Sequence, residues 1–345
     1  MNEGVSQVQA ESAGKSAAGR TVGHWLMARL TNIAPFITLI FLVLIFSAMS
    51  PSFTTLDNLA NILRQIAITG IIATGLTFVI LTAEIDLSVA SVANAVGIVV
   101  AFFTLQESYV NIANLPLPGP IAMLLAVLAA LALGAFTAFG VTVIGIPSFI
   151  MTLAMMQIGA GVCALLVRGQ IAYAVPPTVK LLGSGTILGM PAIVVIAALF
   201  LLVGHIVLTY TRFGRYIYMV GGNREAAEYS GVNVKAIIAA VMIIGAFCSG
   251  VAGMLGVAYY GSAQQNQFDD YLLDSISAVV VGGTSLFGGQ GGIPNTIIGL
   301  FVLGVLNNGL DHIDIDSFLK ILIRGLILLL ALVINVYAQK LRARA

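Results

Sequence analysis

The feature that most restricts the fold of this chain is a succession of long apolar runs, which recur from Ile33 to Tyr337 without an extended polar interval. Of its 345 residues 59% are hydrophobic and 8% are charged, whereas roughly a quarter of the residues in a soluble domain are charged. A helix that crosses the hydrocarbon core of a bilayer needs about twenty apolar residues. The sequence therefore predicts an all-α integral membrane protein, built as a single domain over residues 32–338.

About ten apolar runs are candidates for crossing a membrane. We expect helices near residues 33–50, 65–83, 87–105, 120–143, 147–166, 191–210, 236–258, 273–287, 295–311 and 318–337. Residues 1–31 are rich in Ser, Ala and Gly, which is typical of a disordered tail. Residues 339–345 form a short basic tail.

The positions of the basic residues predict the orientation. Ten of the fifteen Lys and Arg residues fall on one side of a ten-span arrangement: Lys15, Arg20, Arg29, Arg212, Arg215, Arg224, Lys235, Lys340, Arg342 and Arg344. The opposite side carries acidic residues, namely Asp57, Glu107, Asp269, Asp270, Asp314 and Asp316. Because loops rich in Lys and Arg remain in the cytoplasm, both termini are expected to be cytoplasmic.

Several classes of function find no support in the sequence. The net charge is +1 and no basic stripe carries interleaved aromatic residues, which argues against nucleic-acid binding. His24, His205 and His312 match no metal or catalytic spacing, so we predict no metal site, no cofactor and no enzymatic activity. Cys163 and Cys248 lie inside apolar runs, as small core residues do.

Small residues four positions apart predict that some spans pack closely against neighbouring helices. The pairs are Ala246 with Gly250, Ser249 with Gly253, and Gly134 with Ala138.

The longest basic loop, residues 211–235, contains a short predicted helix from Asn223 to Ser230 that a glycine terminates. Its Glu-Ala-Ala sequence, followed after three residues by Gly, resembles the coupling helix by which permease subunits of ABC importers dock on their ATPase. The resemblance assigns this coupling to Asn223, Arg224, Glu225, Ala226, Ala227 and Gly231. The Leu-Pro element that follows this glycine in the family is absent. An ordinary basic cytoplasmic loop is an equally good interpretation of the segment by itself.

Two further stretches, residues 82–94 and 274–292, resemble signature segments of the ribose, xylose and arabinose importer permeases. The resemblance extends from Phe53 to Tyr337. Where the family commonly has Gly-Gly before Ile-Asp, this chain has Ala83-Glu84, and Ala90 replaces another family glycine. The resemblance implies a bacterial inner-membrane protein that works as a pair, most simply a homodimer. Its implied partners are a separate ABC ATPase, a periplasmic sugar-binding protein and a small sugar as solute.

The same stretches contain candidates for the solute path and for a hinge. Asp86 is expected to cap a helix that starts at Leu87, or else to contact solute. Glu84 faces either cytosolic water or an internal cavity. Each glycine costs about 1 kcal/mol in a helix relative to Ala, so the stretch 282–292 is a re-entrant element, a hinge or a plain turn. The hinge candidates are Gly282, Gly283, Gly288 and Gly289.

Four amides inside predicted spans complete the candidates for the solute path: Asn94, Gln157, Asn307 and Asn308. Sugar hydroxyls require neutral donors and acceptors, and amides supply both. Each amide could instead form a hydrogen bond between helices. Arg324 either pairs with an acid or extends toward the membrane surface.

The residues and the resemblance together predict a sugar-transporting ABC permease. A branched-chain amino acid permease is the nearest alternative within the importer class. A secondary transporter would need an intramembrane ion site, and a membrane enzyme would need clustered catalytic ligands; the sequence offers neither.

Overall fold

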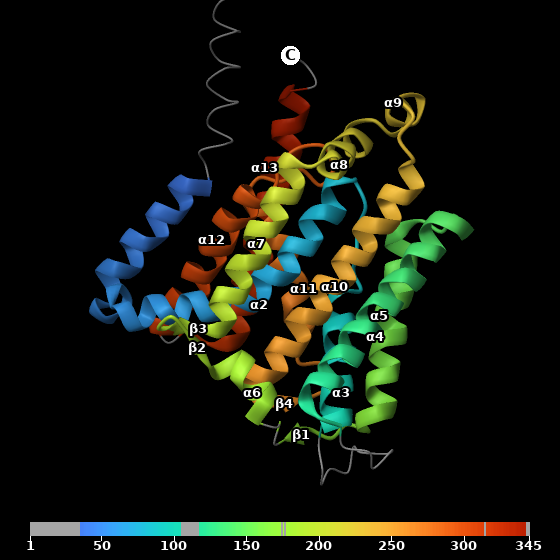
Figure 1. The fold of residues 1–345 in the computed structure, drawn as a ribbon. Helices are drawn as coiled ribbons and strands as arrows, with labels where there is room; N and C mark the ends of the chain where they lie inside the picture. The colour runs from blue at the N-terminus through green and yellow to red at the C-terminus, as the bar shows by residue number, and fades with distance from the viewer. Residues whose placement is uncertain (1–34, 105–116, 174, 176, 314, 343–345) are drawn as a thin grey trace, which may run out of the picture.

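The computed structural model describes residues 35–104, 117–173, 175, 177–313 and 315–342, so the predicted tail over residues 1–31 lies outside the described residues. The described chain is helical, apart from two small two-stranded sheets, β1–β4 and β2–β3, and the segments that connect the elements (Figure 1). The first helix, Pro35–Met49, is followed by η1 (Pro51–Thr54), α2 (Leu56–Leu81), α3 (Val89–Thr104), α4 (Gly119–Phe139), η2 (Gly140–Ile144), α5 (Ser148–Val167), β1 (Ala172–Tyr173), α6 (Pro177–Ser184), β2 (Thr186–Ile187), β3 (Met190–Pro191), α7 (Ala192–Tyr210), α8 (Arg212–Gly222), α9 (Arg224–Tyr229), α10 (Val234–Tyr260), β4 (Ser262–Ala263), α11 (Asp269–Val281), α12 (Ile293–His312) and α13 (Ser317–Arg342).

The predicted helical architecture is confirmed, and a helix covers most of every predicted apolar segment. Six helices of the described chain are long and apolar enough to cross a membrane: α2, α4 with η2, α5, α7, α10 and α12. The helix Pro35–Met49 and α3 are apolar but shorter. Since α11 has 13 residues, it extends about 20 Å. Ten membrane crossings therefore stay a prediction.

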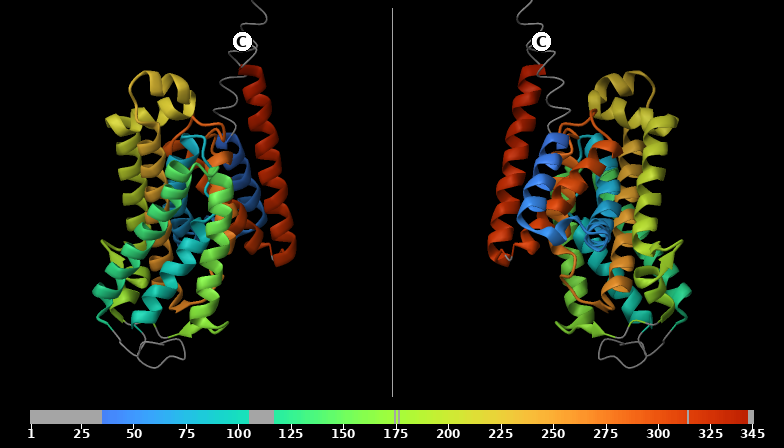
Figure 2. Two further views of the ribbon diagram at one scale, coloured as in Figure 1. Left: turned by 90° about the vertical axis from the view of Figure 1, so that its right-hand side faces the viewer. Right: turned by 90° about the vertical axis from the view of Figure 1, so that its left-hand side faces the viewer.

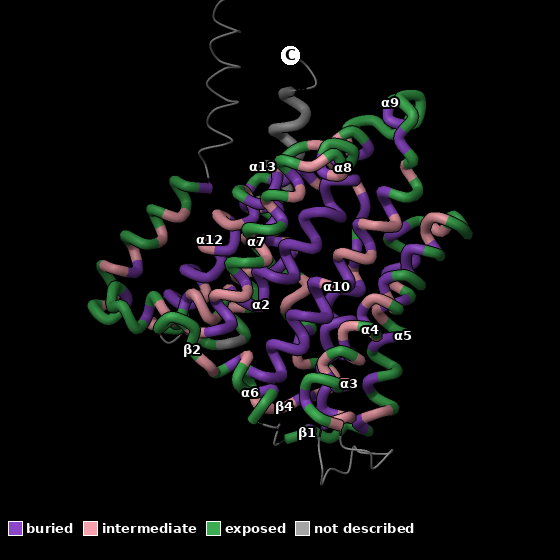
Figure 3. Tube along the Cα trace, viewed as in Figure 1, coloured by how far each residue is buried: buried purple, intermediate pink, exposed green. Residues whose placement is uncertain are grey.

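Helices α2 and α10 form the centre of the bundle, and their buried residues are surrounded by the other helices (Figure 3). Gly134 of α4 lies against Ala246 of α10, and Gly250 of α10 lies against Ala130 of α4. The predicted close packing through small residues is thus confirmed for these two helices. Both cysteines are free and buried, which confirms that they are core residues.

Two of the inner helices are short because non-helical backbone adjoins them. The segment 82–88 separates α2 from α3, so the expected helix start at Leu87 is wrong by two residues. Helix α11 ends at Val281, whereas the sequence predicted helix to residue 287. Five glycines in the segment 282–292 have positive φ angles, which L-residues with side chains rarely adopt: Gly283, Gly288, Gly289, Gly291 and Gly292.

Helices α8 and α9 lie together at one end of the bundle, and α13 ends on the same side (Figures 1 and 2). The helix Pro35–Met49 begins toward that end as well (Figure 1). The opposite end carries α6 and both small sheets. The basic residues of α8 and α9 are therefore separated along the bundle axis from Asp269 and Asp270, which begin α11.

Candidate functional site

The predicted coupling segment forms the short helix α9, between α8 and α10. Asn223 precedes it, and its Oδ1 accepts a hydrogen bond of 3.0 Å from the Ala226 amide. Gly231 follows it with a φ of 81°, and a Cβ there would meet no atom within 4 Å. Ala227 is buried, whereas Arg224, Glu225 and Ala226 are exposed. The predicted helix is confirmed, and it presents an exposed charged face.

Arg224 joins α9 to the end of α2. Its Nη2 lies 2.5 Å from Oε1 of Glu84 and donates to the Thr82 carbonyl at 3.3 Å. The Glu84 side chain is 7% exposed and that of Arg224 is 48% exposed. Of the two environments that the sequence left open for Glu84, open water is therefore excluded. The carboxylate is held inside the protein by a guanidinium from the candidate coupling helix.

Glycines allow three backbone segments to meet beside this ion pair. The Gly289 amide donates to the Leu81 carbonyl at 3.0 Å. A Cβ at Gly221 of α8 would overlap that same carbonyl and would approach the Gly289 amide. The glycine-rich segment 282–292 thus contacts α8 and the end of α2, so its Gly289 lies at the α8–α9 end of the bundle.

Tyr218 of α8 provides a further link to the glycine-rich segment. Its hydroxyl donates a hydrogen bond of 2.9 Å to the Gly291 carbonyl. Burial raises the pKa of Tyr218, so the phenol keeps the proton that it donates. Both α8 and α9 are therefore bonded to non-helical segments of the bundle.

Asp86 shapes the segment that leads into α3. Its Oδ1 accepts from the Ser88 amide at 2.8 Å and from the Ser88 hydroxyl at 2.6 Å. Asp86 is buried and α3 begins at Val89, so the carboxylate stabilises the approach to the helix and does not cap a helix at Leu87. Ala83, which occupies a position where the family commonly has glycine, has a φ of 60°. Ala83 therefore has a left-handed backbone conformation, which glycine adopts more readily than alanine.

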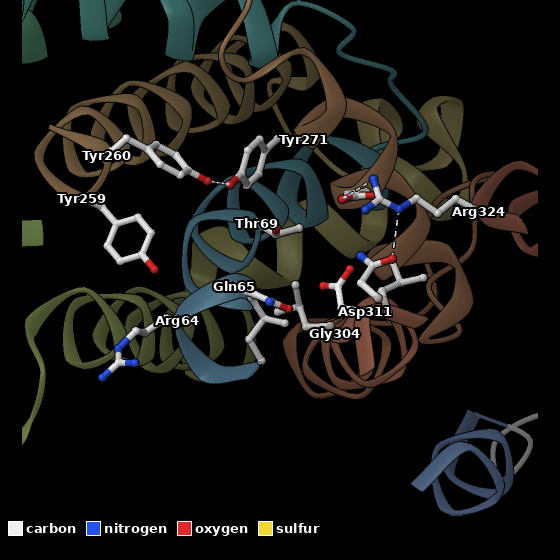
Figure 4. A pocket seen from close by; sticks show the side chains of 14 residues that line it. Arg64, Gln65, Thr69, Tyr259, Tyr260, Tyr271, Gly304, Asp311 and Arg324 are labelled. Atoms are coloured by element: carbon white, nitrogen blue, oxygen red, sulfur yellow. Dashed lines mark hydrogen bonds and ion pairs between the residues drawn. The ribbon is translucent and has the colours of Figure 1, made fainter. Parts of the chain in front are cut away.

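A pocket of about 350 Å³ lies beside the C-terminal end of α10 (Figure 4). This end of α10 is in the half of the bundle away from α8 and α9 (Figure 1). The pocket is bounded by α2, α10, α11, α12 and α13. Ten of its fourteen lining residues have polar side chains: Arg64, Gln65, Thr69, Tyr259, Tyr260, Tyr271, Asp274, Asn307, Asp311 and Arg324. Ile66, Leu300, Leu303 and Gly304 supply the rest.

Several lining residues bond to one another. Arg324 donates from Nε to Asn307 Oδ1 at 2.9 Å, and its Nη1 lies 3.7 Å from Asp274 Oδ2. Of the two predictions for Arg324, pairing with an acid is confirmed. The hydroxyls of Tyr260 and Tyr271 lie 2.5 Å apart. Nothing in the described chain gathers three His, Cys, Asp or Glu side chains as metal ligands.

The four amide residues predicted as candidates for the solute path lie in different environments in the structure. Asn307 lines the pocket. Asn308 is buried and exchanges hydrogen bonds with Asn58, of 2.8 and 2.9 Å. Asn94 donates to Asp269 at 2.7 Å and accepts from the Phe268 amide at 2.9 Å. Gln157 is exposed on α5.

Most of the pocket residues, including Gln65 and the three tyrosines, were not predicted from the sequence. One signal was present: Tyr259, Tyr260 and Tyr271 bracket the connection between two apolar segments. The approach of α2 and α12 to this connection depends on tertiary packing, which the sequence pattern does not report.

Known proteins resemble this chain over most of its length. Residues 58–332 match the family model described as "Branched-chain amino acid transport system / permease component". The ribose import permease protein RbsC of Haemophilus influenzae is 38% identical over 308 residues, which cover 88% of this chain and 92% of the relative. RbsC of Escherichia coli K12 is 37% identical over 315 residues, covering 90% and 94%.

The xylose transport system permease protein XylH of Escherichia coli K12 is 31% identical over 335 residues, covering 79% of this chain and 83% of the relative. No solved structure matches the chain.

Proposed function

This chain belongs to the family of branched-chain amino acid transport system permease components, and from that premise we propose that it is the membrane permease subunit of an ATP-binding-cassette sugar importer. Relatives that cover most of the chain are named as ribose and xylose permeases. These names favour a sugar over a branched-chain amino acid as the solute. The apolar helices agree with a multi-pass membrane protein.

The proposed assembly contains two copies of this chain in a bacterial inner membrane. Each copy crosses the membrane about ten times, with both termini and α8–α9 in the cytoplasm. An ABC ATPase on a separate polypeptide docks on α9 and supplies all ATP hydrolysis. A periplasmic sugar-binding protein delivers solute to the opposite face.

The proposed coupling runs from α9 into the bundle. ATPase closure shifts α9, and the Arg224–Glu84 ion pair carries that shift to the segment 82–88. The contacts of Gly221 and Tyr218 carry it to the glycine-rich segment 282–292. Because this backbone is non-helical, small changes of its dihedral angles can tilt α3 and α11 relative to α2 and α10. Such tilting would alternate access between the two sides of the membrane.

The observation that carries the proposal is that the exposed helix α9 is bonded through Arg224 to the buried Glu84. The test is ATP hydrolysis by the complete importer in proteoliposomes, with and without the solute-loaded binding protein. We expect Glu225→Gln and Gly231→Ala to lower solute-stimulated hydrolysis while membrane insertion is unchanged. Asp57→Asn removes an exposed carboxylate near the opposite end of the bundle and should leave stimulation unchanged.

Unchanged stimulation in both loop variants would contradict the role of α9. Accumulation of solute by this chain in liposomes that contain neither partner would contradict the importer function itself.

A further inference from the structure

We propose, on the basis of the importer function above, that the pocket between α2, α10, α11, α12 and α13 is a solute site that selects a neutral monosaccharide. Its volume of about 350 Å³ lies at the lower end of the range of about 300–1,000 Å³ for small-molecule sites. A compact solute fits such a space, and an oligosaccharide would not be enclosed by it.

The charges of the pocket balance. Arg64 and Arg324 contribute two positive charges, and Asp274 and Asp311 contribute two negative charges. Arg324 lies beside Asp274, and Asp311 is paired with Lys320. Arg64 donates a hydrogen bond to the neutral Asn61 amide. The four charged lining residues therefore sum to zero, and a neutral solute would leave both ion pairs intact.

Neutral hydrogen-bonding groups remain available among these pairs. Within the described chain, the Gln65 amide, Asn307 Nδ2 and the Tyr259 hydroxyl form no hydrogen bond, and all three residues line the pocket. Sugar hydroxyls are both donors and acceptors, so an amide and a phenol can each bond to them. A solute without hydroxyls would leave these polar groups unpaired, which costs binding free energy.

The aromatic side chains of the lining can pack against the apolar C–H faces of a sugar ring. Tyr259, Tyr260 and Tyr271 contribute rings from the end of α10 and from α11 (Figure 4). Aromatic rings offer an apolar face together with a polar tip, and a sugar ring likewise has apolar C–H faces and a hydroxylated edge. In the proposed orientation the pocket lies in the periplasmic half, where the binding protein would deliver its solute.

The test is ATP-dependent uptake by the complete importer in proteoliposomes. The probes are D-ribose, D-xylose, D-galactose and D-glucose, together with two solutes that carry charged groups, the anion D-ribose 5-phosphate and the zwitterion L-leucine. We expect uptake of at least one neutral sugar and of neither charged solute. Gln65→Leu should lower uptake of that sugar about tenfold.

Two further variants make the outcome decisive. Gln170→Leu makes the same chemical change at an exposed amide between α5 and β1 and should leave uptake unchanged. Tyr259→Phe removes a single hydroxyl and should lower uptake even if Gln65→Leu fails to insert. Uptake unchanged in Gln65→Leu and Tyr259→Phe, or equally reduced in Gln170→Leu, would overturn the pocket assignment. If the parent importer takes up no probe, the importer function fails instead, and transport of a charged solute alone would overturn the neutral specificity.

Discussion

Arg224 Nη2 lies 2.5 Å from Glu84 Oε1, although the two residues are 140 positions apart in the chain. Glu84 is the buried partner, and Arg224 extends to it from an exposed helix. If α9 moved alone, the buried carboxylate would lose its counter-ion, although solvent around the half-exposed Arg224 limits the cost of that loss. The ion pair therefore couples the position of α9 to that of the segment 82–88.

Removing the charge of Glu84 should uncouple ATP hydrolysis from solute. We expect Glu84→Gln to lower solute-stimulated hydrolysis several-fold, because the remaining amide bonds the guanidinium weakly. Arg224→Gln should have a similar effect, and the double variant should be no worse than either single variant, since both changes break one interaction. Because Arg224 is half exposed, the ion pair should contribute about 1 kcal/mol or less to stability. Hydrolysis in proteoliposomes and thermal unfolding in detergent measure the two effects.

Arg215→Gln is the matched control for the arginine. Arg215 is exposed on α8 and forms no ion pair with the described residues. Its removal should leave solute stimulation intact. Additive losses in the Glu84/Arg224 cycle would show that the two residues act separately.

Adjacent glycines on α8 should respond differently to alanine. A Cβ at Gly221 would overlap the Leu81 carbonyl and crowd the Gly289 amide, whereas a Cβ at Gly222 meets no atom within 4 Å. Gly221→Ala should destabilise the protein by about 1–3 kcal/mol, because three backbone segments must separate. Gly222→Ala should be neutral or slightly stabilising, by up to about 1 kcal/mol. Thermal unfolding of the purified variants measures both, and equal shifts would contradict the close contact.

The apolar runs were sufficient to predict which segments are helical, but they did not predict where every helix begins and ends. The sequence 120–143 and the helix Gly119–Phe139 nearly coincide, because hydrophobic length alone decides that element. In α2 the helix begins at Leu56, nine residues before the predicted start. The added turns contain Asp57, Asn58 and Asn61, which are too polar to be counted in an apolar run. The helix nevertheless starts before them, because the Thr55 side chain caps its N-terminus.

The site was predictable where the signal was local. The helix from Asn223 to Ser230 followed from a cap residue and a glycine stop. The ion-pair partner of Glu84 could not be predicted in this way, because Arg224 is distant in the chain and is one of several basic residues in its loop. The different environments of Asn307 and Asn308 were equally unpredictable from the sequence. These neighbours point to different sides of α12, one into the pocket and one toward Asn58, and helix packing decides which.

Breaking the amide pair between α2 and α12 should destabilise the bundle. Asn308→Leu removes two hydrogen bonds to Asn58 in a buried site, and we expect a loss of about 1–2 kcal/mol. Gln157→Leu, the same type of change at an exposed amide, should cost less than about 0.5 kcal/mol. Denaturant unfolding in detergent compares them. Equal stability of the two variants would argue that the amide pair contributes nothing.

A carboxylate at position 94 should repel the start of α11. Asn94 donates to Asp269 and accepts from the Phe268 amide, so it joins α3 to α11 through both ends of its side chain. Asn94→Asp keeps the shape but replaces the donor by a second negative charge beside Asp269. We expect it to lower stability by about 1–3 kcal/mol, measured by thermal unfolding in detergent.

The control makes the identical change in the opposite electrostatic surroundings. Asn61 is exposed and accepts a hydrogen bond of 2.8 Å from Arg64. Asn61→Asp would place its new charge beside a guanidinium, so its stability should be unchanged or raised by up to about 1 kcal/mol. If both variants lose the same stability, the loss arises from aspartate itself and not from Asp269. A loss confined to Asn94→Asp would identify the amide as the structural link that sets where α11 begins.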